Sequence, residues 1–118
     1  MSVLESIMEE THNRWQENGW SYSEFLSYLT TRELVVVMLA KLNYQVENGG
    51  FDQWFENGYG DHTSATFAAL RAVNTNVARM VSELVSEAVS RRQDRDGDYD
   101  DLDSKYYGVN SQLVEDLE

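Results

Sequence analysis

The most constraining feature of this sequence is a run of seven apolar residues, Leu34-Val35-Val36-Val37-Met38-Leu39-Ala40. Its three consecutive valines are compatible with a buried strand. The preceding Thr30-Thr31-Arg32-Glu33, however, has the spacing of a capping box, in which a hydroxyl and a carboxylate each accept a backbone N–H at a helix start. We therefore predict a helix over residues 31–47, ended by a left-handed glycine at Gly49 or Gly50. Because this helix is apolar around its circumference, other helices must cover it.

The rest of the chain also has helical patterns, and it contains no proline to interrupt them. Apolar residues at helical spacing run from Leu4 to Trp15, and a second capping box lies at Ser21-Tyr22-Ser23-Glu24. We expect an all-α fold, a compact single domain over residues 1–118 with about six to seven helices around residues 31–47. The further helices are predicted over Phe51–Phe55, from Asp61 or Thr63 to Val73, from Asn74 or Thr75 to Arg92, and between Asp101 and Leu117.

Negative charge is the strongest feature of the composition. The 21 acidic and 9 basic residues give a formal net charge of −12. Residues 1–60 contain nine acids and three bases, and residues 94–118 contain nine acids and two bases. Such a surface repels nucleic acids and anionic membranes and attracts basic proteins. Six of the acids lie in residues 91–103, which we predict to be an acidic loop within the domain: Asp94, Asp96, Asp98, Asp100, Asp101 and Asp103.

Motifs for metal binding and catalysis are missing from the sequence. The alternating aspartates resemble an EF-hand, but a loop that starts at Asp94 has Tyr99 and Lys105 where the motif requires glycine and glutamate. There is no cysteine, the only histidines are His12 and His62, and no nucleotide-binding or hydrolase motif is present. We therefore expect no metal, no cofactor and no enzymatic activity.

The sequence also has no sign of a targeting or membrane segment. The first ten residues contain three glutamates and no base, unlike a signal peptide. No apolar run approaches the roughly 20 residues that span a bilayer. We predict a cytoplasmic protein that does not contact membranes.

Three parts of the sequence together carry a family resemblance. The most distinctive is Tyr44-Gln45-Val46-Glu47-Asn48-Gly49-Gly50-Phe51-Asp52-Gln53-Trp54-Phe55-Glu56-Asn57. It is followed by Ala68-Ala69-Leu70 with a helix over residues 77–89, and then by an acidic approach to Lys105-Tyr106-Tyr107. Over residues 30–118 the chain resembles the neisserial DNA-mimic protein family of small helical proteins. The resemblance implies an all-helical fold and a surface of carboxylates that imitates DNA phosphates on the DNA-binding face of a target.

We therefore expect carboxylates on helices to take the place of phosphates, which follow one another at about 1.7 Å per charge along duplex DNA. Glu5 and Glu9, one helical turn apart, are separated by about 6 Å along the axis. The expected partner is a basic DNA-binding protein or nucleoprotein complex, a transcription factor or a restriction or CRISPR nuclease, bound by a monomer or homodimer. The predicted contact residues are Glu5, Glu9, Asp52, Glu56, Asp94, Asp96, Asp98, Asp100, Asp101, Asp103, Glu115 and Asp116.

Two other functions are compatible with the same charge. One is an acidic immunity or adaptor protein that binds a basic partner through shape and aromatic contacts, without imitating DNA. The other is adaptation to high salt with no specific use of the charge, which the presence of only two lysines allows. Competition with DNA separates the first of these from mimicry, and unfolding at low salt without any partner favours the second.

Overall fold

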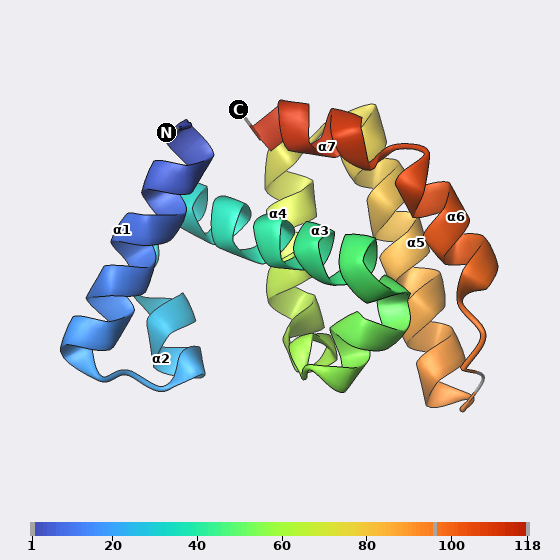
Figure 1. Cartoon of the computed structure of the whole chain (residues 1–118), viewed down its shortest axis with the longest axis horizontal. Coiled ribbons are helices and arrows are strands. Elements are labelled where there is room, and N and C mark those ends of the chain that lie inside the picture. Colours follow the sequence, from blue (N-terminus) through green and yellow to red (C-terminus); the bar gives the residue numbers. More distant parts are fainter. Residues whose placement is uncertain (1, 96, 118) are drawn as a thin grey trace.

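The computed structural model describes residues 2–95 and 97–117, which form helices joined by short connections (Figure 1). Within these residues there is no strand. The predicted all-α single-domain bundle is confirmed. In chain order the elements are α1 (Val3–Asn18), α2 (Tyr22–Ser27), α3 (Thr31–Glu56), the 3-10 helix η1 (Tyr59–His62), α4 (Thr63–Val73), α5 (Asn76–Gln93), α6 (Asp100–Tyr107) and α7 (Asn110–Leu117).

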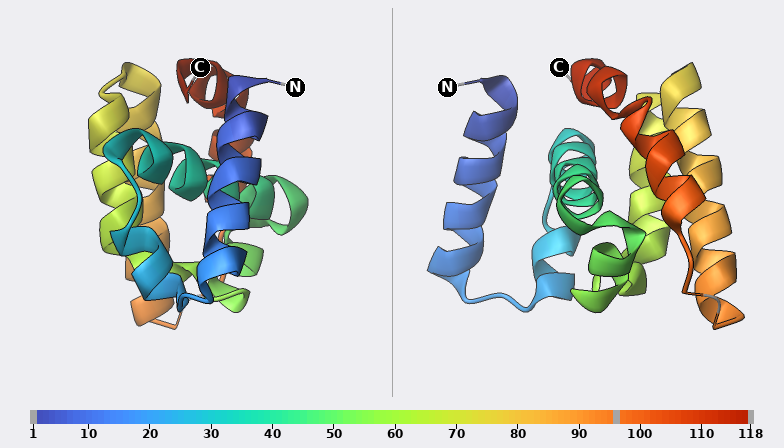
Figure 2. Two further views of the ribbon diagram at one scale, coloured as in Figure 1. Left: turned by 90° about the vertical axis from the view of Figure 1, so that its left-hand side faces the viewer. Right: turned by 45° about the vertical axis from the view of Figure 1, so that its right-hand side comes forward.

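The long helix α3 lies in the middle of the bundle. It packs against α1, η1, α4, α6 and α7, and its Val36, Leu39 and Leu42 are fully buried. Figures 1 and 2 show α1 on one side of α3 and the α5–α6 pair on the opposite side, with the two chain ends at the same end of the molecule. The predicted central helix is confirmed, because its apolar circumference is covered by the other helices.

The local signals for helix starts are confirmed at most positions. In the first capping box Ser21 Oγ accepts from Glu24 N at 3.2 Å, and in the second Thr30 Oγ1 accepts from Glu33 N at 3.2 Å. Thr75 Oγ1 caps α5 by accepting from Ala78 N at 3.1 Å. The predicted cap of α4 at Asp61 or Thr63 is wrong, because η1 leads directly into α4 and the residue at the cap position is His62, which makes no side-chain capping bond.

A kink at Gly49 and Gly50 interrupts α3 where the glycines predicted a helix end, and the helix predicted over Phe51–Phe55 forms its second half. Gly49 (φ −151°) and Gly50 (φ 74°) are both non-helical, but the helix resumes at once and continues to Glu56. Gly50 has the predicted positive φ, whereas its ψ of −176° is not that of a left-handed cap. This conformation is essentially restricted to glycine. The two halves of α3 therefore point in different directions.

The acidic segment is more ordered than the loop predicted over residues 91–103. Helix α5 continues through Gln93 and α6 begins at Asp100, so only residues 94–99 connect them. The helix expected to begin near Asp101 is confirmed. No helix in the described part of the chain is both long enough and apolar enough to cross a membrane.

Candidate protein-interaction surface

The kink of α3 packs against the first turn of α6. A break in a helix leaves backbone amides without helical acceptors. One of these, Phe51 N, donates to Asp103 Oδ1 of α6 at 2.9 Å. Gly50 makes room for this contact, because a Cβ at that position would lie 2.3 Å from Asp103 Oδ2. Asp103 therefore caps the second half of α3 from a different helix.

Asp103 also marks a concentration of negative charge. Burial raises its pKa, and the nearby carboxylates of Asp100, Asp52 and Asp101 raise it further, although the bond from Phe51 N acts in the opposite direction. Mutual effects of this kind require carboxylates that lie close together. We call Asp52, Asp100, Asp101 and Asp103 the acidic cluster. Its members come from the second half of α3 and the first turn of α6.

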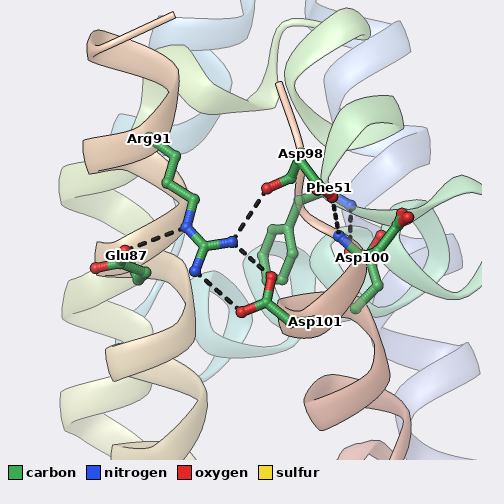
Figure 3. Close-up of polar contacts among 7 residues, drawn as sticks. Phe51, Glu87, Arg91, Asp98, Asp100 and Asp101 are labelled. Carbon is green, nitrogen blue, oxygen red and sulfur yellow. Dashed lines mark hydrogen bonds and ion pairs between the residues drawn. The ribbon is translucent and has the colours of Figure 1, made fainter. Parts of the chain in front are cut away.

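Arg91 of α5 holds the start of α6 in place (Figure 3). Its Nη1 and Nη2 donate to the two carboxylate oxygens of Asp101 at 2.6 and 3.0 Å, and Nη1 also donates to the Asp98 carbonyl at 3.0 Å. On the other side, Nε donates to Glu87 Oε1 at 3.1 Å. The paired bonds to Arg91 lower the pKa of Asp101 to about 2. Bidentate geometry of this kind fixes orientation as well as charge.

The carboxylates of this region therefore have two different roles. Asp101 is engaged with Arg91 of α5 and Asp103 with Phe51 N of α3, so their contacts hold α6 against both helices. Asp98 is exposed and its Oδ1 accepts from Asp100 N at 3.1 Å, which braces the end of the connection. Four other acids of the same helices and their connection are exposed: Asp52, Glu56, Asp94 and Asp100. Of these, Asp52 and Asp100 lie near Asp103.

The structure does not bring all the predicted contact residues together. Glu5 and Glu9 are exposed on α1, which lies at the opposite end of the molecule from α6 in Figures 1 and 2. Glu115 is exposed on α7, and the half-buried Asp116 accepts from Gln112 Nε2 at 2.9 Å. Asp96 lies outside the described residues. The acids thus form at least two separate regions.

Three residues that sequence reasoning missed are important here. Arg91 and Glu87 were not among the predicted contact residues; they pair with each other, and Arg91 also pairs with the start of α6. Glu47, in the first half of α3, accepts from Asn43 Nδ2 at 3.2 Å and from Asn110 Nδ2 at 3.3 Å. The Arg91-Arg92 pair shortly before the run of aspartates is a sequence signal for the Arg91 contacts, whereas nothing in the sequence indicates those of Glu47. In the part of the chain that the structure describes, no three His, Asp or Glu side chains are grouped to hold a metal ion.

Comparison with known proteins identifies the family. A family model described as DMP19-like protein matches residues 27–118. This chain belongs to that family. The resemblance to DNA-mimic proteins seen in the sequence is thereby confirmed. No curated protein and no solved structure gives a significant match.

The DMP19-like match places the acidic cluster within the family portion of the chain. The matched residues include all of α3 to α7, and with them the kink, Arg91 and the aspartates of α6. Helix α1 and nearly all of α2 precede the match. The acids of the α3–α6 junction and of α7 belong to the matched portion, whereas Glu5 and Glu9 of α1 lie outside it.

Proposed function

We propose that this protein binds a basic DNA-binding protein at its nucleic-acid site, with carboxylates in place of DNA phosphates, and that it acts without catalysis. Membership of the DMP19-like family and the net charge of −12 support this. The observation that carries it is the bracing of the acidic region at the α3–α6 junction by Arg91 and Phe51 N. The target class we propose is a transcription factor or a defence nuclease of the restriction or CRISPR type.

Rigid carboxylates suit this role for a physical reason. A site that binds duplex DNA is lined with Lys and Arg spaced for a regular row of phosphates. Carboxylates that are already oriented lose less conformational freedom when they meet such a site, so more of the interaction energy remains as affinity. Attraction of opposite charges also speeds association, and salt screens it within about 8–10 Å.

The proposed contact surface is centred on the junction. Asp52, Glu56, Asp94 and Asp100 face the partner, with Asp98 beside them. Asp101 and Asp103 act mainly by holding these residues in position. Asp96, Glu5, Glu9, Glu115 and Asp116 are kept as outer contacts for a partner large enough to reach them.

Two variants that each lose four negative charges, and so have the same net charge, test this assignment. The junction variant combines Asp52→Asn, Glu56→Gln, Asp94→Asn and Asp100→Asn, and the control combines the exposed Glu10→Gln, Glu17→Gln, Asp61→Asn and Glu83→Gln, which are not proposed contacts. The partner is first isolated by pull-down and identified by mass spectrometry. We expect the junction variant to bind it at least about tenfold more weakly, with a shallower salt dependence, because interface charge pairs carry such energies. Equal weakening by both variants means that only total charge matters and removes the junction from the site.

Competition with DNA tests mimicry itself. Duplex DNA that contains the partner's binding site is titrated into the preformed complex, and the released protein is measured. Mimicry predicts complete displacement, because the two ligands occupy one site. A complex that persists at saturating DNA contradicts mimicry and favours the acidic adaptor.

A further inference from the structure

A groove of about 370 Å³ lies where α1, α3 and α7 meet. Its size is near the lower end of ligand sites, which are about 300–1,000 Å³, so it has room for one or two side chains of a partner. The apolar walls come from all three helices. The lining residues are Leu4, Ala40, Asn43, Tyr44, Glu47, Asn48, Val114 and Leu117.

Aromatic side chains stand exposed at and beside the groove. Tyr44, on its wall, is 63% exposed. Tyr107 is 47% exposed, and its hydroxyl donates to the Val46 carbonyl at 2.9 Å, which fixes the ring next to the Glu47 turn of α3. Exposed tyrosines are typical anchors in protein interfaces because they combine a large apolar area with a polar end.

A single carboxylate, Glu47, is held in a fixed position at the groove. Its Oε2 accepts from Asn43 Nδ2 at 3.2 Å and from Asn110 Nδ2 at 3.3 Å. Asn43 is fixed in turn, because its Oδ1 accepts from the hydroxyl of the fully buried Tyr106 at 2.8 Å. A carboxylate that two amides orient is ready to receive a cation without further ordering.

The groove adjoins the acidic cluster through Tyr107. Burial raises the pKa of Tyr107, and the negative charges of Asp103 and Glu47 raise it further. Tyr107 therefore lies near both Asp103 of the cluster and Glu47 of the groove, with its hydroxyl on the Val46 carbonyl. A partner that covers the junction can reach the groove without crossing the molecule.

We propose that this groove docks a basic partner segment that carries one large apolar side chain beside an arginine or lysine. The apolar side chain enters between α1, α3 and α7, and the cation pairs with Glu47. The charge of the groove argues for this occupant, because its lining residues include one carboxylate and no base. The net charge of −12 opposes the approach of a second copy of the chain. The inference goes beyond the proposed function, because it does not require that the protein imitate DNA. A basic partner that has no DNA-binding site could occupy the groove in the same way.

Synthetic peptides provide the probe. We suggest a fluorescent peptide of twelve residues with three arginines around one tryptophan, together with a matched peptide in which glycine replaces the tryptophan. The glycine peptide measures general attraction to the acidic surface. We expect the tryptophan peptide to bind at least about fivefold more tightly in fluorescence anisotropy, as expected for one anchoring side chain. We also expect that the tryptophan peptide shifts the backbone amide resonances of the protein at the groove residues of α3 and α7.

Two variants separate the apolar contact from the ionic one. Tyr44→Ala should weaken the tryptophan peptide to a similar extent at low and high salt, whereas Glu47→Gln should weaken it at low salt only, because salt screens the ion pair. Unchanged circular dichroism spectra and thermal midpoints establish that both variants fold. The junction variant should bind both peptides more weakly than the wild type does. The ratio of its affinities for the tryptophan peptide and the glycine peptide should equal that of the wild type.

Three results would overturn the inference. One is equal binding of the two peptides, and a second is peptide-induced shifts confined to the α3–α6 junction. The third is a concentration-dependent dimer in sedimentation that Tyr44→Ala dissociates, because the occupant is then a second copy. None of these affects the DNA competition experiment, so the groove and the proposed mimicry can fail separately.

Discussion

The outer face of α1 and the α3–α6 junction are both acidic, but their carboxylates are held differently. On α1, the side chains of Glu9 and Glu10 are exposed, and no hydrogen bond or ion pair to them occurs within residues 2–95 and 97–117. At the junction, Asp101 and Asp103 are tied to Arg91 and Phe51 N. Acidity by itself, or a count of acids along the sequence, therefore does not indicate how firmly the carboxylates are held. This property distinguishes a fixed array of carboxylates from a solvated acidic surface.

The largest expected effect is loss of the core beneath the junction. Trp54 is 1% exposed, and its ring makes edge contacts with Phe51 and Phe55 at centroid distances of 6.3 and 5.0 Å. Trp54→Ala should lower the free energy of unfolding by about 3–5 kcal/mol in urea titrations. Met80→Ala, at a position that is 48% exposed, is the control and should change it by less than about 0.5 kcal/mol. Similar values for the two variants would show that the junction does not depend on this core.

Alanine at the kink should have the next largest effect. Gly19 and Gly50 both have positive φ, 61° and 74°, but a Cβ meets nothing within 4 Å at Gly19 and would meet Asp103 Oδ2 at Gly50. Gly19→Ala should cost about 1–2 kcal/mol, the cost of a left-handed backbone. Gly50→Ala should cost at least about 1 kcal/mol more, because its backbone conformation is less accessible to alanine and Asp103 must move. Equal losses in thermal unfolding would contradict the tight junction.

Neutralising Asp101 should have a smaller effect that depends on pH. Its pKa is lowered from 3.8 to about 2 in the folded protein, so ionisation of Asp101 favours folding. The stabilisation is present above about pH 4 and is lost as the pH falls through about 2. Asp101→Asn should therefore lower the thermal midpoint at pH 7 and leave it near that of the wild type at pH 2. With Glu9→Gln as the α1 control we expect no such convergence, and a pH-independent difference for Asp101→Asn would contradict the ion pair with Arg91.

The smallest effect is expected for Asp103→Asn. Because the folded protein raises the pKa of Asp103, ionisation opposes folding, and the wild type loses stability as the pH rises from 3.8 through the folded value. Asparagine does not ionise and can still accept from Phe51 N, so Asp103→Asn should be at least as stable as the wild type at pH 7.

The matched comparison is Asp103→Ala, which leaves that amide without its acceptor and should cost about 1 kcal/mol. Denaturant titrations of both variants give the measurement. If asparagine and alanine are equally destabilising, the bond to Phe51 N is not the main role of Asp103.

Local contacts of this fold could be predicted from the sequence, whereas long-range contacts could not. The Ser21 and Thr30 capping boxes are confirmed because each joins residues three positions apart, a spacing that is visible in the sequence. The bond between Phe51 N and Asp103 joins residues 52 positions apart, and only the packing of α6 on the kink creates it. The glycines predicted the break in α3 and the aromatic spacing predicted the short helix over Phe51–Phe55, but neither indicated that this helix follows the break without a connecting loop.

The candidate contact residues show the same limit. Their identity as exposed acids followed from composition, and most of them are exposed in the structure. Their division into a braced junction and a distant α1 depends on the placement of α1 across the bundle from α6 (Figure 1). Asp101 and Asp103 were grouped with the outward acids, but their carboxylates are engaged with Arg91 and with Phe51 N, although Asp101 remains exposed.

The hydrogen bonds of Arg91 also determine where residues can be inserted into the connection between α5 and α6. One guanidinium binds both the Asp98 carbonyl and the Asp101 carboxylate, so the connection between α5 and α6 is closed at its base by a non-covalent crosslink. Residues inserted after Asp94 would lengthen the connection without shifting Asp98 or the start of α6. Such an insertion would leave the junction geometry intact and place the added residues next to Asp94, within the proposed contact surface.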